Sequence, residues 1–194
     1  MKRFASVFLP LAVTAVVLAA TVASSTTLAG ESTVAGAGIT AVKIVRSSTG
    51  IGTDGNFTNF ASWQNVPGAT LTIRVPAGTR ALIVARFFAE STCVKPGDTS
   101  ETFCALRIKI GGKEALPGGG FNFAFDSANQ GGETTSSGEG HSMERSRGPL
   151  RAGTYTVQLQ WGVHGPGSTI VTCSTVCFFL NDWSFSAERV LVRS

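Results

Sequence analysis

Hydrophobic and polar residues alternate with a period of two along most of the chain from Ala41 onward. Successive side chains of a β-strand point to opposite faces, so this alternation is typical of strands with one buried face. The clearest strand is expected from Thr154 to Val163. Its inward-facing residues are expected to be Tyr155, Val157, Leu159, Trp161 and Val163, whereas Thr156, Gln158 and Gln160 should face water. No stretch of this region has the 3.6-residue period of a good helix.

Several neighbouring segments show the same alternation and are separated by glycine and proline. Leu71 to Val75 is expected to be a strand that ends in a tight turn at Pro76-Ala77-Gly78. Leu106 to Ile110 is expected to form another strand, followed by a hairpin at Gly111-Gly112. Ala81 to Ala89 is almost continuously apolar, which predicts a core strand that is either covered on both sides or at the centre of its sheet.

The last strand is expected from Trp183 to Val192. Its apolar residues change face along its length, which predicts a bulge near Ala187 and Glu188. Further strands are expected at Val42–Val45, Phe57–Trp63, Phe121–Phe125, His141–Leu150 and Thr169–Thr172, and the polar stretch Gln130–Gly140 is expected to be a mobile surface loop. About eight to ten short strands with regular turns predict an all-β fold, an antiparallel β-sandwich of the jelly-roll kind.

The N-terminal segment has the character of an export signal. Lys2 and Arg3 precede an apolar stretch, Phe4 to Val22, that gives way to small residues. Pro10 interrupts the apolar run and no basic cluster follows it, which argues against an uncleaved membrane anchor. Cleavage is expected after residue 23 or residue 29, both of which are alanine.

One domain is expected to follow this signal. We expect residues 1–29 to be the signal peptide, residues 30–40 a flexible leader and residues 41–194 the jelly-roll domain. The protein should then be secreted and extracellular, with no membrane association after cleavage. Loss of Lys2 and Arg3 lowers the formal net charge from +4 to +2. The remaining cations are scattered, as at Arg74, Arg107 and Lys109, which argues against a nucleic-acid partner.

Four cysteines lie after the signal, at positions Cys93, Cys104, Cys173 and Cys177. An even number in an exported chain favours disulfides, and three pairings are formally available. The turn residues between Cys93 and Cys104 favour that pair, which leaves Cys173 with Cys177. A four-thiolate metal site would prefer paired two-residue spacings, which these cysteines lack.

Residues suited to catalysis are few. The chain has two histidines, His141 and His164, and the serine beside His141 lacks the glycine that a nucleophile elbow requires. Glu144 would point away from Glu139 and His141 on a strand, so these three do not predict a metal site. Four acids near expected loops, Asp126, Glu133, Glu139 and Asp182, could supply a carboxylate pair for glycoside hydrolysis. We expect no enzyme and no cofactor, with a small glycan-active hydrolase as the alternative.

A cluster of aromatic and amide residues is the best candidate ligand site. It comprises Asn56, Phe57, Asn59, Phe60 and Trp63. Aromatic rings can stack on sugars and amides can bind their hydroxyl groups, so the cluster predicts glycan binding. The competing interpretation is that Trp63 and the two phenylalanines close one end of the core.

Three motifs are distributed over the chain after the signal: Trp63-Gln64-Asn65-Val66-Pro67-Gly68, the segment Leu150 to Trp161, and Asn181-Asp182-Trp183 with Glu188-Arg189-Val190. Together they resemble bacterial extracellular domains with the tumour-necrosis-factor-like or complement-head-like jelly roll. The resemblance implies a compact homo-trimer that binds partners or glycans. We therefore expect a non-catalytic domain for recognition of a glycan or cell-surface protein, or for self-assembly.

Overall fold

The computed structural model describes residues 30–35, 40–53, 63–94, 101–119, 123–128, 138–165 and 177–192. These residues contain strands and connections but no helix. The strands are β1 (Gly30–Ala35), β2 (Thr40–Ser47), β3 (Ile51–Gly52), β4 (Gln64–Cys93), β5 (Thr102–Ile110), β6 (Lys113–Glu114), β7 (Ala124–Ala128), β8 (Glu139–His164) and β9 (Phe178–Val192). Every pairing between them is antiparallel, which confirms the predicted all-β antiparallel class.

The strands form one hydrogen-bonded sheet in the order β1-β2-β9-β4-β8-β5-β6, with β3 paired to β9 and β7 paired to β5. The sequence predicted only short strands, but β4 has 30 residues and β8 has 26. These two pair along almost their whole length, from Gln64 opposite Trp161 to Ser91 opposite Glu139. This β4/β8 pair forms the central ribbon of the sheet.

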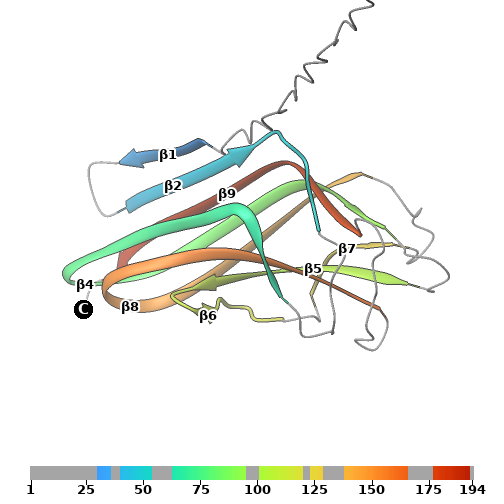
Figure 1. Ribbon diagram of the computed structural model, residues 1–194. Helices are drawn as coiled ribbons and strands as arrows, with labels where there is room; N and C mark the ends of the chain where they lie inside the picture. The colour runs from blue at the N-terminus through green and yellow to red at the C-terminus, as the bar shows by residue number, and fades with distance from the viewer. Residues whose placement is uncertain are drawn as a thin grey trace, which may run out of the picture.

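Both long strands turn back on themselves at the left end of Figure 1. The pairing shifts register there, between Val75 and Arg80 of β4. Proline has no N–H group to donate, and Gly78 has a φ of 72°, so Pro76 to Gly78 is suited to a break in the ladder. The turn predicted at this point is therefore a bend within a continuous paired ribbon.

The bend divides the sheet into two halves that share one core. Residues 64–75 of β4 lie with the end of β8 and with β5, whereas residues 80–93 lie with the start of β8 and with β9. Trp161 and Phe178 have ring centroids 6.2 Å apart although β8 and β9 are not paired, and Phe87 lies 5.6 Å from Phe125 of β7. Apolar side chains of both halves therefore pack against each other.

The alternation predicted for residues 154–163 is confirmed. Val157, Leu159, Trp161 and Val163 are each at most 2% exposed, whereas Thr156 faces solvent. The hairpin at Gly111-Gly112 is also confirmed, since both glycines have positive φ and join β5 to β6. Residues 81–89 lie between β8 and β9, at the centre of the sheet as predicted.

The bulge predicted near Ala187 and Glu188 is wrong. Pairing of β9 with β2 and β4 runs without interruption through these residues. The register shifts instead opposite Phe88 and Glu90, beside Asp182, whose φ is 43°. Val190 and Val192 simply face outward, 38% and 43% exposed, and their exposure produced the apparent change of face.

The predicted disulfide between Cys93 and Cys104 is present and ties the end of β4 to β5 across the two halves. Cys177 is also disulfide-bonded. Its predicted partner, Cys173, lies outside the described residues, as do residues 1–29, the predicted strand Thr169–Thr172 and most of the loops. The segment 30–40, predicted as a leader, contains β1. Within the described part of the chain, no helix has the length and apolar character needed to cross a membrane.

Candidate functional site

Polar residues from three neighbouring strands line up on the outward side of the first half of the sheet. Gln160 of β8 lies opposite both Asn65 of β4 and Arg107 of β5. Two residues along, Gln158 lies opposite both Thr70 and Lys109. The alternation that buries Val157, Leu159 and Trp161 turns these amides outward. We call this set the polar face: Asn65, Thr70, Arg107, Lys109, Gln158 and Gln160.

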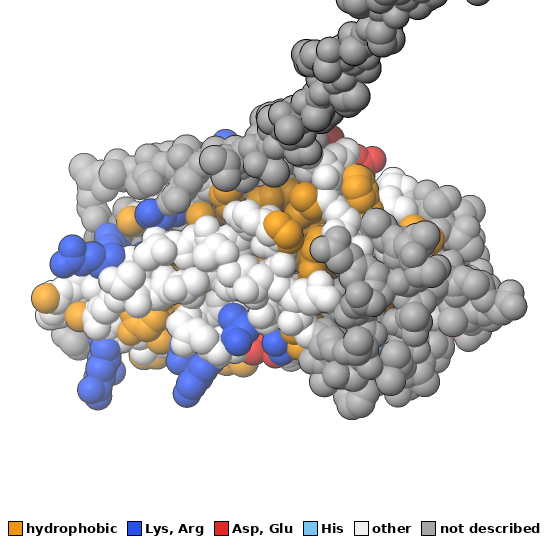
Figure 2. All heavy atoms as spheres, in the orientation of Figure 1, with side chains coloured by type: hydrophobic (Ala, Val, Ile, Leu, Met, Phe, Trp, Pro, Cys, Tyr) orange, Lys and Arg blue, Asp and Glu red, His pale blue; other side chains and the backbone are white. Residues whose placement is uncertain are grey.

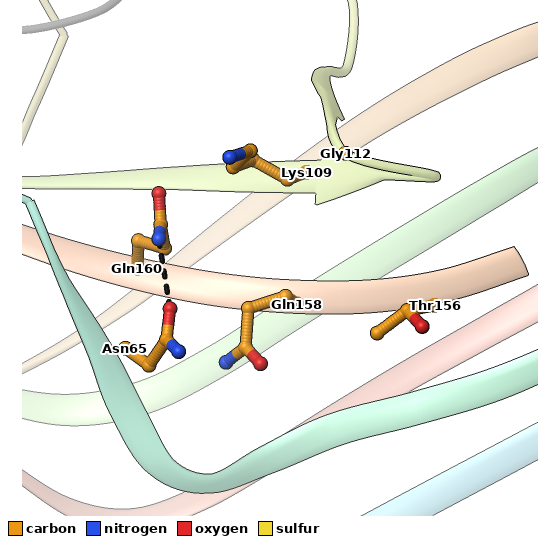
Figure 3. A pocket seen from close by; sticks show the side chains of 6 residues that line it. All are labelled: Asn65, Lys109, Gly112, Thr156, Gln158 and Gln160. Atoms are coloured by element: carbon orange, nitrogen blue, oxygen red, sulfur yellow. Dashed lines mark hydrogen bonds between the residues drawn. The ribbon is translucent and has the colours of Figure 1, made fainter.

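Side-chain hydrogen bonds hold the first row in place. The Nε2 group of Gln160 donates to Oδ1 of Asn65 at 2.7 Å, and Nε of Arg107 donates to Oε1 of Gln160 at 2.8 Å. The first of these bonds is the dashed line in Figure 3. The guanidinium carbon of Arg107 lies 4.3 Å from the centre of the Trp63 ring, a cation–π contact. Trp63 is therefore linked to the polar face through Arg107.

The second row is anchored to the backbone. Oγ1 of Thr70 donates to Oε1 of Gln158 at 2.6 Å, and Nε2 of Gln158 donates to the carbonyl groups of Ala69 and Leu159 at 3.1 and 2.8 Å. Lys109 stands at the end of this row. Its ammonium group has no hydrogen-bond or ion-pair partner among the described residues.

These side chains border an open hollow of about 410 Å³. It is lined by side chains of β4, β8 and β5, namely Asn65, Thr156, Gln158, Gln160 and Lys109, and by Gly112 of the turn that follows β5 (Figure 3). Its volume is within the range of small-molecule sites, but its lining contains no apolar side chain. Figure 2 shows this side of the molecule as mainly neutral polar surface over β4 and β8, with Lys and Arg side chains along its lower edge.

The hollow has a positive electrostatic character. Burial lowers the pKa of Arg107, and the nearby carboxylate of Glu114 partly opposes this effect. Arginine nevertheless keeps its charge in proteins. Glu114 lies 3.9 Å from Arg107 and also accepts a hydrogen bond from the backbone N–H of Gly119. One acid therefore accompanies two cations, Arg107 and Lys109, at this site.

Of the five residues predicted to bind a ligand, the structure describes only Trp63. The other four, Asn56, Phe57, Asn59 and Phe60, lie outside the described residues. Trp63 is half-buried and does not belong to the core cluster. Its ring contacts the guanidinium group of Arg107, which belongs to the polar face. Gln158 and Gln160 were predicted only as water-facing strand residues, and Asn65 was noted only as part of the motif Trp63 to Gly68.

A second polar cluster lies between the two halves, around Ser91. The hydroxyl group of Ser91 donates to Oδ2 of Asp126 at 2.6 Å and lies 2.9 Å from Nδ1 of His141. A serine hydroxyl has one proton, so it accepts the second bond, and Nδ1 of His141 must carry a hydrogen. Glu139 lies 3.8 Å from Nε2 of the same ring. Three distant segments therefore meet in one network.

This network is poorly suited to catalysis. Ser91 is 1% exposed, and it stands between the acid and the histidine, whereas a serine nucleophile needs the histidine in the middle. Asp126 is 8% exposed, and its second carboxylate oxygen accepts the N–H of Ser127. Both groups are therefore buried.

The other candidate acids do not join this network. Glu144 points to the opposite side and pairs with Arg86 at 2.6 Å, as its strand position predicted. Asp182 is exposed at the bulge of β9, and Glu133 lies outside the described residues. Within the described part of the chain, no three His, Cys, Asp or Glu side chains are placed to hold a metal ion.

Comparison with known proteins gives no relative: no protein-family model matches the chain, and no curated protein gives a significant match. The resemblance to the tumour-necrosis-factor-like jelly roll therefore has no family match behind it, and the case for function depends on the geometry of the polar face.

Proposed function

We propose that this chain is a secreted, non-catalytic domain that binds glycans through the polar face of β4, β8 and β5. The observation that carries the proposal is the hollow lined by amide, hydroxyl and ammonium groups on three adjacent strands. Sugar hydroxyl groups both donate and accept hydrogen bonds, and an asparagine or glutamine amide does the same. Because Gln158, Gln160 and Asn65 are held by defined partners, they lose little side-chain freedom on binding.

The proposal extends to the fold and the compartment. We place the domain among jelly-roll-like β-sandwiches, a view supported by the bend of β4 and β8 and by the core shared between the two halves. Export through the N-terminal segment is supported by the disulfide between Cys93 and Cys104, since such bonds persist mainly in oxidising compartments.

The test is a glycan array probed with the mature protein, followed by titration calorimetry of the strongest ligand. Gln160→Ala should weaken binding by about three- to tenfold, the value of one or two hydrogen bonds to neutral groups. Trp63→Ala should also weaken binding, because Arg107 would lose its cation–π contact beside the hollow. Gln160→Ala removes a hydrogen-bonding side chain of the hollow, and Trp63→Ala removes the ring beneath Arg107. Binding to no glycan above background would contradict the proposal.

Asn181→Ala provides a matched control. Asn181 is a β9 amide whose side chain donates to Glu90, in the half of β4 that does not border the hollow. Its removal should leave affinity unchanged. An equal loss of affinity in Asn181→Ala and Gln160→Ala would place the ligand elsewhere.

Self-assembly is a second candidate, favoured by apolar side chains on the outward side of β4 and β9. Phe88, Phe179, Val190 and Val192 are 48%, 37%, 38% and 43% exposed. Burial of such side chains between copies would stabilise the homo-trimer that the resemblance implies. Light scattering at high protein concentration should then give three times the monomer mass, and Phe88→Ser should reduce it. A monomer at all concentrations would exclude this candidate.

A further inference from the structure

We infer that the glycan bound by the polar face is acidic and carries carboxylate or sulfate groups. This inference depends on the proposed glycan-binding function and narrows its ligand class. It starts from Lys109, which lines the hollow and whose ammonium group has no partner within the described residues.

The arrangement of charges on this side of the sheet supports an anionic ligand. Arg107 and Lys109 are two residues apart on β5, so their side chains leave the same side of the sheet about 7 Å apart. Arg74 of β4 is exposed on the same side, opposite Thr154. The acid beside these cations is Glu114, which already accepts from Gly119 and lies 3.9 Å from Arg107. The positive charges of Arg74, Arg107 and Lys109 therefore outnumber it.

A neutral sugar in the hollow would cover Lys109 without giving it a partner. Loss of water from an unpaired ammonium group is costly, whereas a carboxylate or sulfate oxygen would replace that water with a charge-assisted hydrogen bond. The amides of Asn65, Gln158 and Gln160 would bind neighbouring hydroxyl groups. The hollow therefore combines recognition of hydroxyl groups with one free positive charge, the chemistry of an acidic polysaccharide.

The experiment compares three polysaccharides of similar length by calorimetry: polygalacturonate with carboxylates, heparin with sulfates, and neutral dextran. At least one acidic polymer should bind at least tenfold more tightly than dextran. Its affinity should fall as the salt concentration rises from about 50 to about 300 mM, because salt screens the attraction between charges. The two acidic arms distinguish carboxylate from sulfate recognition.

Lys109→Gln keeps the length of the side chain close to that of lysine and removes the charge. It should weaken binding of the acidic polymer by about fivefold, the effect of one partly screened ion pair, and weaken dextran binding by a smaller factor, because a neutral sugar offers Lys109 no charge. Arg46→Gln on β2 removes one exposed positive charge from the other end of the strand order and serves as the control. Circular dichroism would verify that both variants fold.

The outcomes separate this inference from the proposed function. Equal binding of dextran and the acidic polymers would overturn the acidic ligand but leave glycan binding intact. Binding of none of the polysaccharides would contradict the inference, and a blank array would contradict the proposed function as well. Equal affinity for single-stranded DNA, with the same loss in Lys109→Gln, would also overturn it, because the site would then respond to charge alone.

Discussion

Ser91 shows how one hydroxyl group joins segments that are far apart in the chain. It contacts Asp126, 35 positions away, and His141, 50 positions away, and it does so with almost no exposure to solvent. A buried carboxylate needs such donors, because water cannot reach it. The network is therefore a structural feature that fixes β7 against β4 and β8.

Ser91→Ala should lower the free energy of unfolding by about 1 to 3 kcal/mol, since Oδ2 of Asp126 would lose the hydrogen bond from Ser91 in a buried site. Urea denaturation followed by tryptophan fluorescence would measure the change. Ser142→Ala is the matched control: Ser142 is exposed on the same strand as His141 but faces the other side. It should change stability by less than about 0.5 kcal/mol. Similar effects of the two substitutions would show that the network contributes nothing.

At the scale of strands, the bend of the β4/β8 ribbon is the feature that shapes the molecule. Gly148 of β8 lies close to the backbone of β4 just after the bend. A Cβ atom there would meet Cα of Leu82 at 2.8 Å and the carbonyl oxygen of Ala81 at 2.9 Å. Gly78, within the bend, has a φ of 72° and no atom within 4 Å of such a Cβ. One glycine allows close approach, and the other allows a left-handed conformation.

These two glycines give a paired prediction. Gly148→Ala should destabilise the protein by about 1 to 3 kcal/mol, because the backbone of β4 must shift to accept the methyl group. Gly78→Ala should cost about 1 kcal/mol, the conformational penalty alone. Thermal and urea unfolding of both variants would give the comparison. A larger loss in Gly78→Ala would contradict the close packing of the ribbon at Gly148.

The sequence predicted the local features of each strand better than it predicted which strands pair and in which register. Val157, Leu159, Trp161 and Val163 face inward as the alternation indicated, because the burial of every second residue can be predicted from the residues of this segment alone. The bend at Pro76 to Gly78 was recognised, but a bend inside a paired ribbon and a turn that ends a strand have the same local residues. The bulge of β9 was misplaced because the outward position of Val190 and Val192 depends on the pairing of the whole strand.

For the whole molecule, the candidate site was the part that sequence could not assemble. Asn65 and Gln160 form one hydrogen bond across 95 positions of sequence, and Arg107 joins them from a third strand. Trp63 was singled out by its aromatic ring, whereas the glutamines gave no local signal beyond facing water. Only the register of β4, β8 and β5 brings these residues together, and register is a property of the folded sheet.

The most direct test of binding at the polar face is an NMR titration of the ¹⁵N-labelled mature protein with the best ligand from the array. The side-chain amide signals of Asn65, Gln158 and Gln160 and the backbone signal of Lys109 should show the largest, saturable shifts. The outward side of β9 and of the second half of β4 should remain unchanged. Shifts concentrated around Phe88 and Val190, with the amides of the polar face unaffected, would contradict the account.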